Sequence, residues 1–288
     1  MTADERFMIV TGRTGRAVGG SRQGPRHAEN EDNLRIFEPD EGDVRSSHGS
    51  LYVVADGVGG HTKGEVASAL AVDVLTDAYY NGTDEDPTAN LLAAINAANL
   101  RIHESAEAEA TDGLPMATTV VAAAVLRDQL VVANVGDSRA YVVGDGVIRQ
   151  ISHDHSWVQD QLDSGRMTPE EARVSPRRNM ITRALGLGHE VEPEVKTEPD
   201  PSAHTRLVLC TDGVHGVLED RELAELVAGH DPQAAVERIL ALVDQRRGHD
   251  DATLIIVDLA GHVELDEGER PLEAGFIPRV RRFFRRRR

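Results

Sequence analysis

Three short apolar runs in the middle of the chain constrain its fold more than any other feature. Residues 118–126, 129–135 and 139–144 have the length and the composition of strands, and only residues 127–128 and 136–138 separate them. Parallel strands need a crossover connection of a dozen or more residues, so consecutive runs this close together must be antiparallel. We therefore predict an antiparallel meander in this part of the chain.

The rest of the pattern alternates strands with helices. Apolar runs predict further strands at 51–56, 206–211 and 253–257, and amphipathic segments predict helices at 62–80, 87–110, 220–228 and 231–246. Asp231 and Pro232 stand at the cap and first-turn positions of the last helix. One early and one late pair of helices favour an α+β fold, a central two-sheet antiparallel β-sandwich flanked by helices, over a parallel doubly wound sheet.

The two ends of the chain depart from this pattern. Residues 1–18 lack apolar periodicity, and we interpret them as an N-terminal extension or a first edge strand, with one main domain over 19–260. From residue 261 the composition shifts to Glu, Asp, Gly and Pro, which is typical of a solvated linker. Residues 261–288 are therefore predicted to be an acidic linker with an Arg-rich C-terminal tail, in which residues 279–288 hold seven arginines.

Charge and cysteine content narrow the class of protein. The formal net charge is −18, and without the seven arginines of the tail residues 1–278 carry −25. Such an acidic body repels phosphate backbones, so no nucleic acid partner is expected. The single cysteine, Cys210, allows no intrachain disulfide, and neither a membrane-spanning run nor a signal-peptide pattern is present. These features predict a cytoplasmic protein.

The arginine-rich tail leaves three interpretations open. Residues 276–288 join basic side chains with phenylalanine, isoleucine and valine, which suits peripheral contact with an anionic membrane. The same segment could instead be a solvated arm, or it could fold back on the acidic body.

Acidic residues stand at the ends of several predicted strands. The four acidic sites are Glu31-Asp32, Asp56-Gly57, Asp212-Gly213 and Asp250-Asp251. Taken singly, Asp-Gly after a strand is usually a turn. If the strand ends converge, however, the carboxylates repel one another strongly. Bound metal cations usually stabilise such a cluster. A set of oxygen ligands favours Mg or Mn over Zn.

Seven motifs in this order resemble the metal-dependent protein serine/threonine phosphatase family (type 2C), in its bacterial branch. They are NED (30–32), ADGVGGH (55–61), MATT (116–119), ANVGDSRAYV (133–142), DHS followed by a segment through PRRNMITRALG (154–186), TDG (211–213) and DDAT (250–253). The resemblance implies a catalytic domain over 19–260 with a binuclear Mn or Mg centre and a weaker third ion. It also implies hydrolysis of phosphoserine and phosphothreonine on bacterial proteins by a hydroxide that the metals share, opposing Ser/Thr kinases.

The resemblance also assigns roles to particular residues. It implies that Asp56 bridges both metals and that the carbonyl of Gly57 binds one of them, whereas Asp212 and Asp250 hold the other. Asp250 is preferred over Asp251 because it lies three residues before Thr253, as in the Asp-Asn-x-Thr pattern of the family. The remaining metal positions implied by the resemblance are Glu31 and Asp32, directly or through water, and Asp137, which would share the weaker third site with Asp212.

The chain departs from the family pattern around the phosphate site. The family usually has an arginine five residues before the Asp of its acidic pair. Here that position is His27, with Arg26 beside it, and either could anchor the substrate phosphate. Arg22 stands where the family commonly has an aspartate. We name residues 154–180 the flap, and predict that it shapes the choice of protein substrate rather than the chemistry.

Other functions fit the sequence less well. A catalytically weak or inactive regulator with the same fold would typically have lost metal carboxylates, but Asp56, Asp212 and Asp250 are all present. A cysteine-dependent phosphatase needs Cys-x5-Arg, and position 216 is Gly216. The cluster His153-Asp154-His155 matches the DHS motif and is not expected to bind metal.

Overall fold

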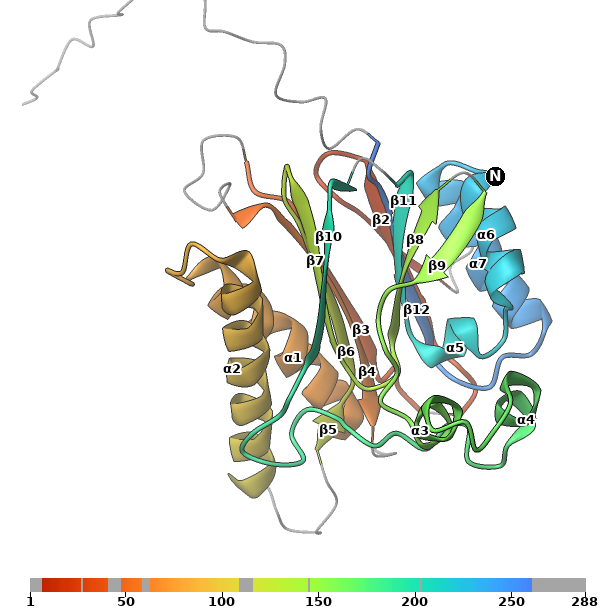
Figure 1. The fold of residues 1–288 in the computed structure, drawn as a ribbon, viewed down its shortest axis with the longest axis horizontal. Coiled ribbons are helices and arrows are strands. Elements are labelled where there is room, and N and C mark those ends of the chain that lie inside the picture. The colour runs from red at the N-terminus through yellow and green to blue at the C-terminus, as the bar shows by residue number, and fades with distance from the viewer. Residues whose placement is uncertain are drawn as a thin grey trace, which may run out of the picture.

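Two antiparallel sheets stack face to face, and helices cover the outer face of each (Figure 1). This computed structural model describes residues 7–26, 28–40, 48–58, 63–108, 116–144, 146–201 and 204–260. The first sheet has the order β1 (Met8–Thr11), β2 (Ala17–Arg22), β12 (Ala252–Asp258), β11 (Arg206–Cys210), β8 (Arg139–Gly144) and β9 (Val147–Gln150). The second has the order β10 (Glu194–Pro199), β7 (Gln129–Val135), β6 (Val120–Val125), β4 (Ser50–Val58) and β3 (Asp32–Phe37), and β5 (Ala117–Thr118) pairs with β4. The predicted flanked sandwich is confirmed.

The predicted meander is wrong in its last strand. β6 and β7 form the expected antiparallel hairpin, but β8 pairs with β11 and β9 in the opposite sheet. Residues 136–138 carry the chain from one sheet to the other, with Gly136 at a φ of 103°. A short connection allows either a hairpin or a crossing between facing sheets, and the apolar run of β8 is compatible with both.

The N-terminal segment contributes to the first sheet. β1 pairs with β2 as an edge strand, and β2 lies beside β12. The domain boundary that we expected at residue 19 falls inside β2, so the sheet already begins at Met8. The acidic linker and the tail, 261–288, lie outside the described residues.

Three apolar layers hold the sandwich together. Leu51 and Val53 of β4 face α1 (Lys63–Tyr80) and α2 (Pro87–Ala108), whereas Tyr52 and Val54 face the opposite sheet. Successive side chains of a strand point to opposite sides, so both faces of this strand are buried and its sequence reads as one continuous apolar run. The outer face of the first sheet packs against α6 (Asp220–Ala228) and α7 (Pro232–Gln245), and Cys210 lies in this layer as predicted.

The remaining helices are short and lie beside one edge of the sheets. α5 (Asp212–His215) follows β11 directly, and the flap contains α3 (Trp157–Asp163) and α4 (Pro169–Val174). α7 begins as the sequence predicts, because Asp231 accepts a hydrogen bond from the amide of Ala234 at 3.0 Å. No helix among the described residues is both long enough and apolar enough to cross a lipid bilayer.

Candidate metal centre

The acidic strand ends meet at one edge of the sandwich, which is the lower edge in Figure 1. Asp32 and Asp56 lie directly opposite each other on β3 and β4. Asp212 follows β11 and Asp250 precedes β12, and these two strands are antiparallel neighbours. Asp137 lies in the crossing between β7 and β8, beside the end of β11. The fold therefore gathers five of the predicted carboxylates, from both sheets, in one place.

Nearby arginines offset the repulsion between these carboxylates only in part, because the pKa values of Asp56, Asp212 and Asp137 remain raised. Burial raises the pKa of Asp56, and the charges of Asp32, Asp212, Asp137 and Asp250 raise it further. Burial and then Asp250 raise the pKa of Asp212 to about 6, and burial followed by Asp212 raises the pKa of Asp137 to about 8. Like charges directly opposite each other on neighbouring strands, such as Asp32 and Asp56, are destabilising. Bound cations would offset this repulsion.

One carboxylate oxygen of the cluster has no protein partner. Asp32 is 7% exposed, and its Oδ2 accepts a hydrogen bond from the hydroxyl of Thr211 at 2.9 Å. Its Oδ1 is buried and has no hydrogen-bond partner among the described residues. A buried unpaired carboxylate oxygen is costly, and a divalent cation would satisfy it. The donor set consists of oxygens, so the residues fit Mg or Mn.

The two adjacent aspartates before β12 have different roles. Both oxygens of Asp251 accept backbone hydrogen bonds, from the amide of Gly24 at 2.7 Å and the amide of Glu31 at 2.8 Å. Asp251 therefore fixes the loops around the centre. Asp250 instead directs Oδ2 toward Arg26, whose Nη1 lies 2.8 Å away. This difference supports Asp250 as the ligand.

Gly57 brings β4 against the start of α1. A Cβ atom at Gly57 would lie 2.4 Å from the backbone of Gly64 and 2.7 Å from the carbonyl oxygen of Glu31, so only glycine fits. The carboxyl group of Glu31 lies against Gly64 in turn. The backbone of Asp56 is held by Thr118, whose hydroxyl donates to its carbonyl at 2.8 Å. The packing thus places Glu31 beside the Asp56-Gly57 pair.

A partly buried histidine that the sequence interpretation missed supports Asp137. Nε2 of His215 donates to the carbonyl oxygen of Asp137 at 3.0 Å, and burial lowers the pKa of His215 to about 3, so the ring is neutral. His215 lies three residues after Asp212, which places both on one face of α5. The position of His215 one helical turn after the aspartate of the TDG motif is the sequence signal that could have identified it.

The DHS motif has a structural role. Asp154 binds the guanidinium group of Arg139 through a forked ion pair, with distances from 2.7 to 3.0 Å. Nδ1 of His155 accepts from the amide of Gly136 at 3.2 Å, and His153 faces Asp163 of α3 at 2.9 Å. These contacts join the flap to the crossing between the sheets.

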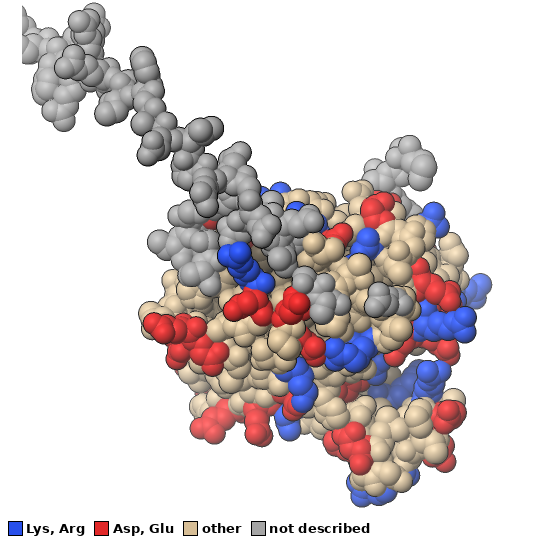
Figure 2. All heavy atoms as spheres, turned by 45° about the horizontal axis from the view of Figure 1, so that its top comes forward, with Lys and Arg blue, Asp and Glu red and all other residues tan. Residues whose placement is uncertain are grey.

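Arginines surround the acidic centre. Arg26, Arg139 and Arg178 all lower the pKa of Asp212 against the effect of burial. Asp212 and Arg178 line a cavity of about 550 Å³ between the flap, α5 and α6. Figure 2 shows a hollow with basic side chains between the body and the lobe at lower right, where Figure 1 places α3 and α4. His27, the other predicted phosphate anchor, lies outside the described residues.

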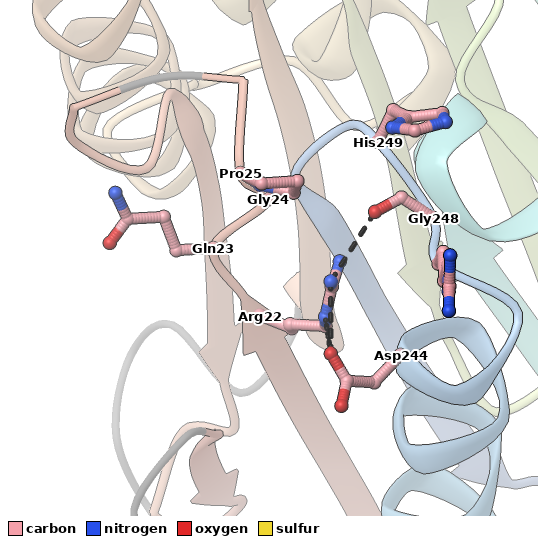
Figure 3. A pocket seen from close by; sticks show the side chains of 8 residues that line it. Arg22, Gln23, Gly24, Pro25, Asp244, Gly248 and His249 are labelled. Carbon is pink, nitrogen blue, oxygen red and sulfur yellow. Dashed lines mark hydrogen bonds and ion pairs between the residues drawn. The ribbon is translucent and has the colours of Figure 1, made fainter.

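Arg22 stabilises the loop that carries Asp250 and Asp251 (Figure 3). Its side chain is 8% exposed and binds the carboxylate of Asp244 at 3.0 Å. It also donates to the carbonyl oxygens of Gly248 and Asp250, each at 3.3 Å. At this position the family commonly has an aspartate, whereas this chain has an arginine that holds the loop before β12 in place.

We expect Arg22→Met to weaken Mn²⁺ binding about tenfold, the usual minimum when a residue that orients ligands is lost. Isothermal titration of Mn²⁺ would measure the change. Arg246→Met is the matched control, because Arg246 pairs with Glu222 at the surface. Equal Mn²⁺ affinity in both variants and the wild type would contradict a positioning role for Arg22.

Comparison with known proteins agrees with this geometry. A family model described as protein phosphatase 2C matches residues 26–249. A serine/threonine phosphatase of Listeria monocytogenes is 35% identical over 234 residues, covering 80% of this chain and 90% of the relative. The serine/threonine protein phosphatase PstP of Mycobacterium tuberculosis is 36% identical over 228 residues, covering 79% of this chain but only 43% of that relative. The crystal structure of the PstP catalytic domain with two manganese ions superimposes with a TM-score of 0.71 at 33% identity, covering 84% of this chain and 97% of that one.

Proposed function

The chain belongs to the protein phosphatase 2C family, and we propose that it removes phosphate from phosphoserine and phosphothreonine side chains of bacterial proteins. The observation that carries this proposal is the convergence of Asp32, Asp56, Asp212 and Asp250 from both sheets, with a buried carboxylate oxygen that has no described partner. Related phosphatases from Listeria and Mycobacterium support the activity.

Each residue of the centre has a defined task in this proposal. Asp56, the carbonyl of Gly57, Asp212 and Asp250 would hold two Mn²⁺ or Mg²⁺ ions, with Glu31 and Asp32 completing the set. When bound, these ions would activate water for attack on phosphorus and neutralise charge on the phosphoryl oxygens.

The surrounding residues have a separate set of tasks. Arg26, directed at Asp250, would orient the phosphate, and Asp137 with Asp212 would form a weaker third site. No side-chain nucleophile is required. Cys210 is unsuitable because burial raises the pKa of its thiol to about 12.

A regulator without activity is the main alternative. It would share the fold but would not need carboxylates from two sheets to face one another at close range. Such repulsion is destabilising unless cations are bound. The fact that the chain keeps all of these carboxylates therefore favours an enzyme over a regulator.

The activity is tested by hydrolysis of p-nitrophenyl phosphate and of a phosphothreonine peptide with Mn²⁺, Mg²⁺, Ca²⁺ or EDTA. We expect turnover with Mn²⁺ or Mg²⁺ and none in EDTA. No turnover of either substrate with any of the metals would support the binding-module alternative instead.

The flap is proposed to select protein substrates, and its arginines have different surroundings. Arg178 lines the cavity beside Asp212, whereas Arg177 stacks over Trp157 at 4.9 Å. Arg166 bonds Ser164 within the flap and serves as a control. Arg178→Ala should reduce phosphoprotein turnover about tenfold, the effect of one lost charge-assisted hydrogen bond, and change p-nitrophenyl phosphate turnover less.

The comparison of the two substrates decides the role of the flap. Arg166→Ala should leave both rates near those of the wild type. Equal losses on both substrates in Arg178→Ala would place Arg178 in the chemistry and contradict a selective role.

Partners and location follow from the proposed activity. Phosphorylated proteins, including Ser/Thr kinases and their substrates, would be its partners in the cytoplasm. Nucleic acid is an unfavourable partner because of the acidic body, and on the face in Figure 2 the described acidic and basic side chains are interspersed.

The arginine-rich tail is proposed to make peripheral contact with anionic membranes. Each arginine near such a surface contributes about 1 kcal/mol. The full chain should therefore sediment with phosphatidylserine vesicles at low salt, whereas a chain ending at Gly275 should not. Equal sedimentation of both chains, or of neither, would favour the solvated arm.

A further inference from the structure

A second group of potential metal ligands lies on α2 and on the loop before β10, outside the carboxylate centre. His103 and Glu107 are one turn apart on α2, and His189 approaches them from residues 186–193. One ligand atom from each residue lies within 4.8 Å of the other two. We propose that these three residues bind a divalent transition metal of the Zn²⁺ class.

The ring of His103 is oriented as in known metal sites. Its Nδ1 lies 3.1 Å from the carbonyl oxygen of Gly186, which can only accept a hydrogen bond, so Nδ1 carries the proton. Nε2 then has its lone pair available, and it lies 3.8 Å from the carboxylate of Glu107. A ligating histidine typically donates its other nitrogen to a backbone carbonyl or a carboxylate in this way, which fixes the tautomer.

The spacing of the ligand atoms is close to what a metal requires. Tetrahedral Zn²⁺ with bonds of about 2.0–2.1 Å separates its ligand atoms by roughly 3.4 Å. The imidazole rings of His103 and His189 already stand edge to face, with centroids 4.3 Å apart. Rotations of the exposed side chains of Glu107 and His189 would complete the set. The remaining coordination position would be open to water.

The backbone around the second histidine is fixed independently of any metal. Asn99 donates to the carbonyl oxygens of Gly188 at 2.9 Å and His189 at 3.2 Å, and its Oδ1 accepts from the amide of Gly186. Gly186 has a φ of +89°, and a Cβ there would lie 2.5 Å from the side chain of Ile102. The loop can therefore approach α2 this closely only with glycine at this position.

The ligand chemistry separates this site from the carboxylate centre. Two imidazoles and one carboxylate favour Zn²⁺, Co²⁺ or Ni²⁺, whereas Mg²⁺ prefers oxygen ligands. Saturating Mg²⁺ can therefore occupy the carboxylates while a transition metal is titrated into the second site.

A metal here would clamp the loop onto α2. Leu185, which immediately precedes this loop, pairs with Thr118 of β5 through two backbone hydrogen bonds of 2.8 and 3.2 Å. The hydroxyl of Thr118 in turn donates to the carbonyl oxygen of Asp56. The bound metal would thus rigidify the segment that joins the flap to β10. Through Thr118, this segment is linked to the strand that carries Asp56.

The test is a Co²⁺ titration of the full chain in excess Mg²⁺, followed by visible absorption, with Zn²⁺ added in competition. We expect one Co²⁺ per chain in this site, and binding about 10- to 100-fold weaker in His103→Gln and His189→Gln. His204→Gln is the matched control, because His204 has one carboxylate neighbour, Glu198 at 3.7 Å. Its Co²⁺ affinity should equal that of the wild type.

Two further measurements make the outcome decisive. The titration is repeated with Asp212→Asn, where retained Co²⁺ binding supports a separate site and lost binding overturns it. Zn²⁺ should also slow amide hydrogen exchange over 186–193 in the wild type and not in His189→Gln. Equal Co²⁺ affinity in His189→Gln and the wild type, or no Co²⁺ binding in excess Mg²⁺, would overturn the proposal.

Discussion

Asp56→Asn and Asp212→Asn should each lower the rate of p-nitrophenyl phosphate hydrolysis at least about 100-fold, as loss of a group that stabilises transition-state charge does. Asp56 interacts electrostatically with four other aspartates of the centre, and Asp212 interacts with Asp250 and lines the cavity beside the flap. Removing either charge weakens the hold on the ions that activate water. Steady-state kinetics across Mn²⁺ concentrations would measure the loss.

The same substitutions should stabilise the metal-free protein at neutral pH. The pKa of Asp212 is about 6 in the folded state, above the ordinary value near 4. A carboxyl group with a raised folded-state pKa contributes stability at low pH that is lost as pH rises through the folded-state value. In EDTA, the wild type should therefore melt at a lower temperature at about pH 7 than at about pH 4.5, and Asp212→Asn should reduce this difference.

An aspartate at the surface provides the control for both measurements. Asp73 of α1 is exposed and pairs with Arg35, so Asp73→Asn removes one carboxylate away from the centre. It should leave kinetics and metal-free stability nearly unchanged. Activity within tenfold of the wild type in both Asp56→Asn and Asp212→Asn would exclude the binuclear centre.

Arg26→Ala should raise KM for a phosphothreonine peptide about 10- to 100-fold, because one charge-assisted hydrogen bond is worth roughly 1.5–3 kcal/mol. The guanidinium group of Arg26 lies 2.8 Å from Asp250, and its side chain is 59% exposed, so a phosphate at the centre could exchange with this contact. The value of kcat should change less, since a phosphate-binding residue acts mainly on substrate affinity.

Three companion variants identify the phosphate anchor. His27→Ala tests the position where the family usually has arginine, and the double variant shows whether the two residues act together. Arg149→Ala is the control, because Arg149 of β9 forms an exposed ion pair with Glu198 of β10. If neither single variant nor the double variant changes KM, the phosphate is held by the metals alone.

The sequence determined the fold class and indicated most of the carboxylates that the fold brings together. The close spacing of two apolar runs predicted the antiparallel hairpin of β6 and β7, and the continuous apolar sequence of residues 51–55 reflects burial on both faces of β4. Asp-Gly pairs at strand ends, together with five other motifs in family order, indicated carboxylates that converge. Local chemistry also set the start of α7, because Asp231 caps its first turn.

Only the tertiary structure decided how these pieces are arranged. The apolar run 139–144 is compatible both with a meander and with a crossing to the facing sheet. The pattern of apolar residues shows that the strand is buried but does not identify its partner, which is β11. The family pattern already favoured Asp250 over Asp251, but only the structure gives a physical reason, because both oxygens of Asp251 accept hydrogen bonds from the amides of Gly24 and Glu31.

Contacts between residues far apart in the chain could not be predicted from the sequence. Arg22 departs from the family pattern, and its role appears only when Asp244 and Gly248 are placed beside it. His103 and His189 are separated by 86 positions and belong to none of the seven motifs, yet their rings are in contact. Local periodicity reports which face of an element is buried, but pairing between distant side chains is set by how whole elements pack, and this information belongs to the fold.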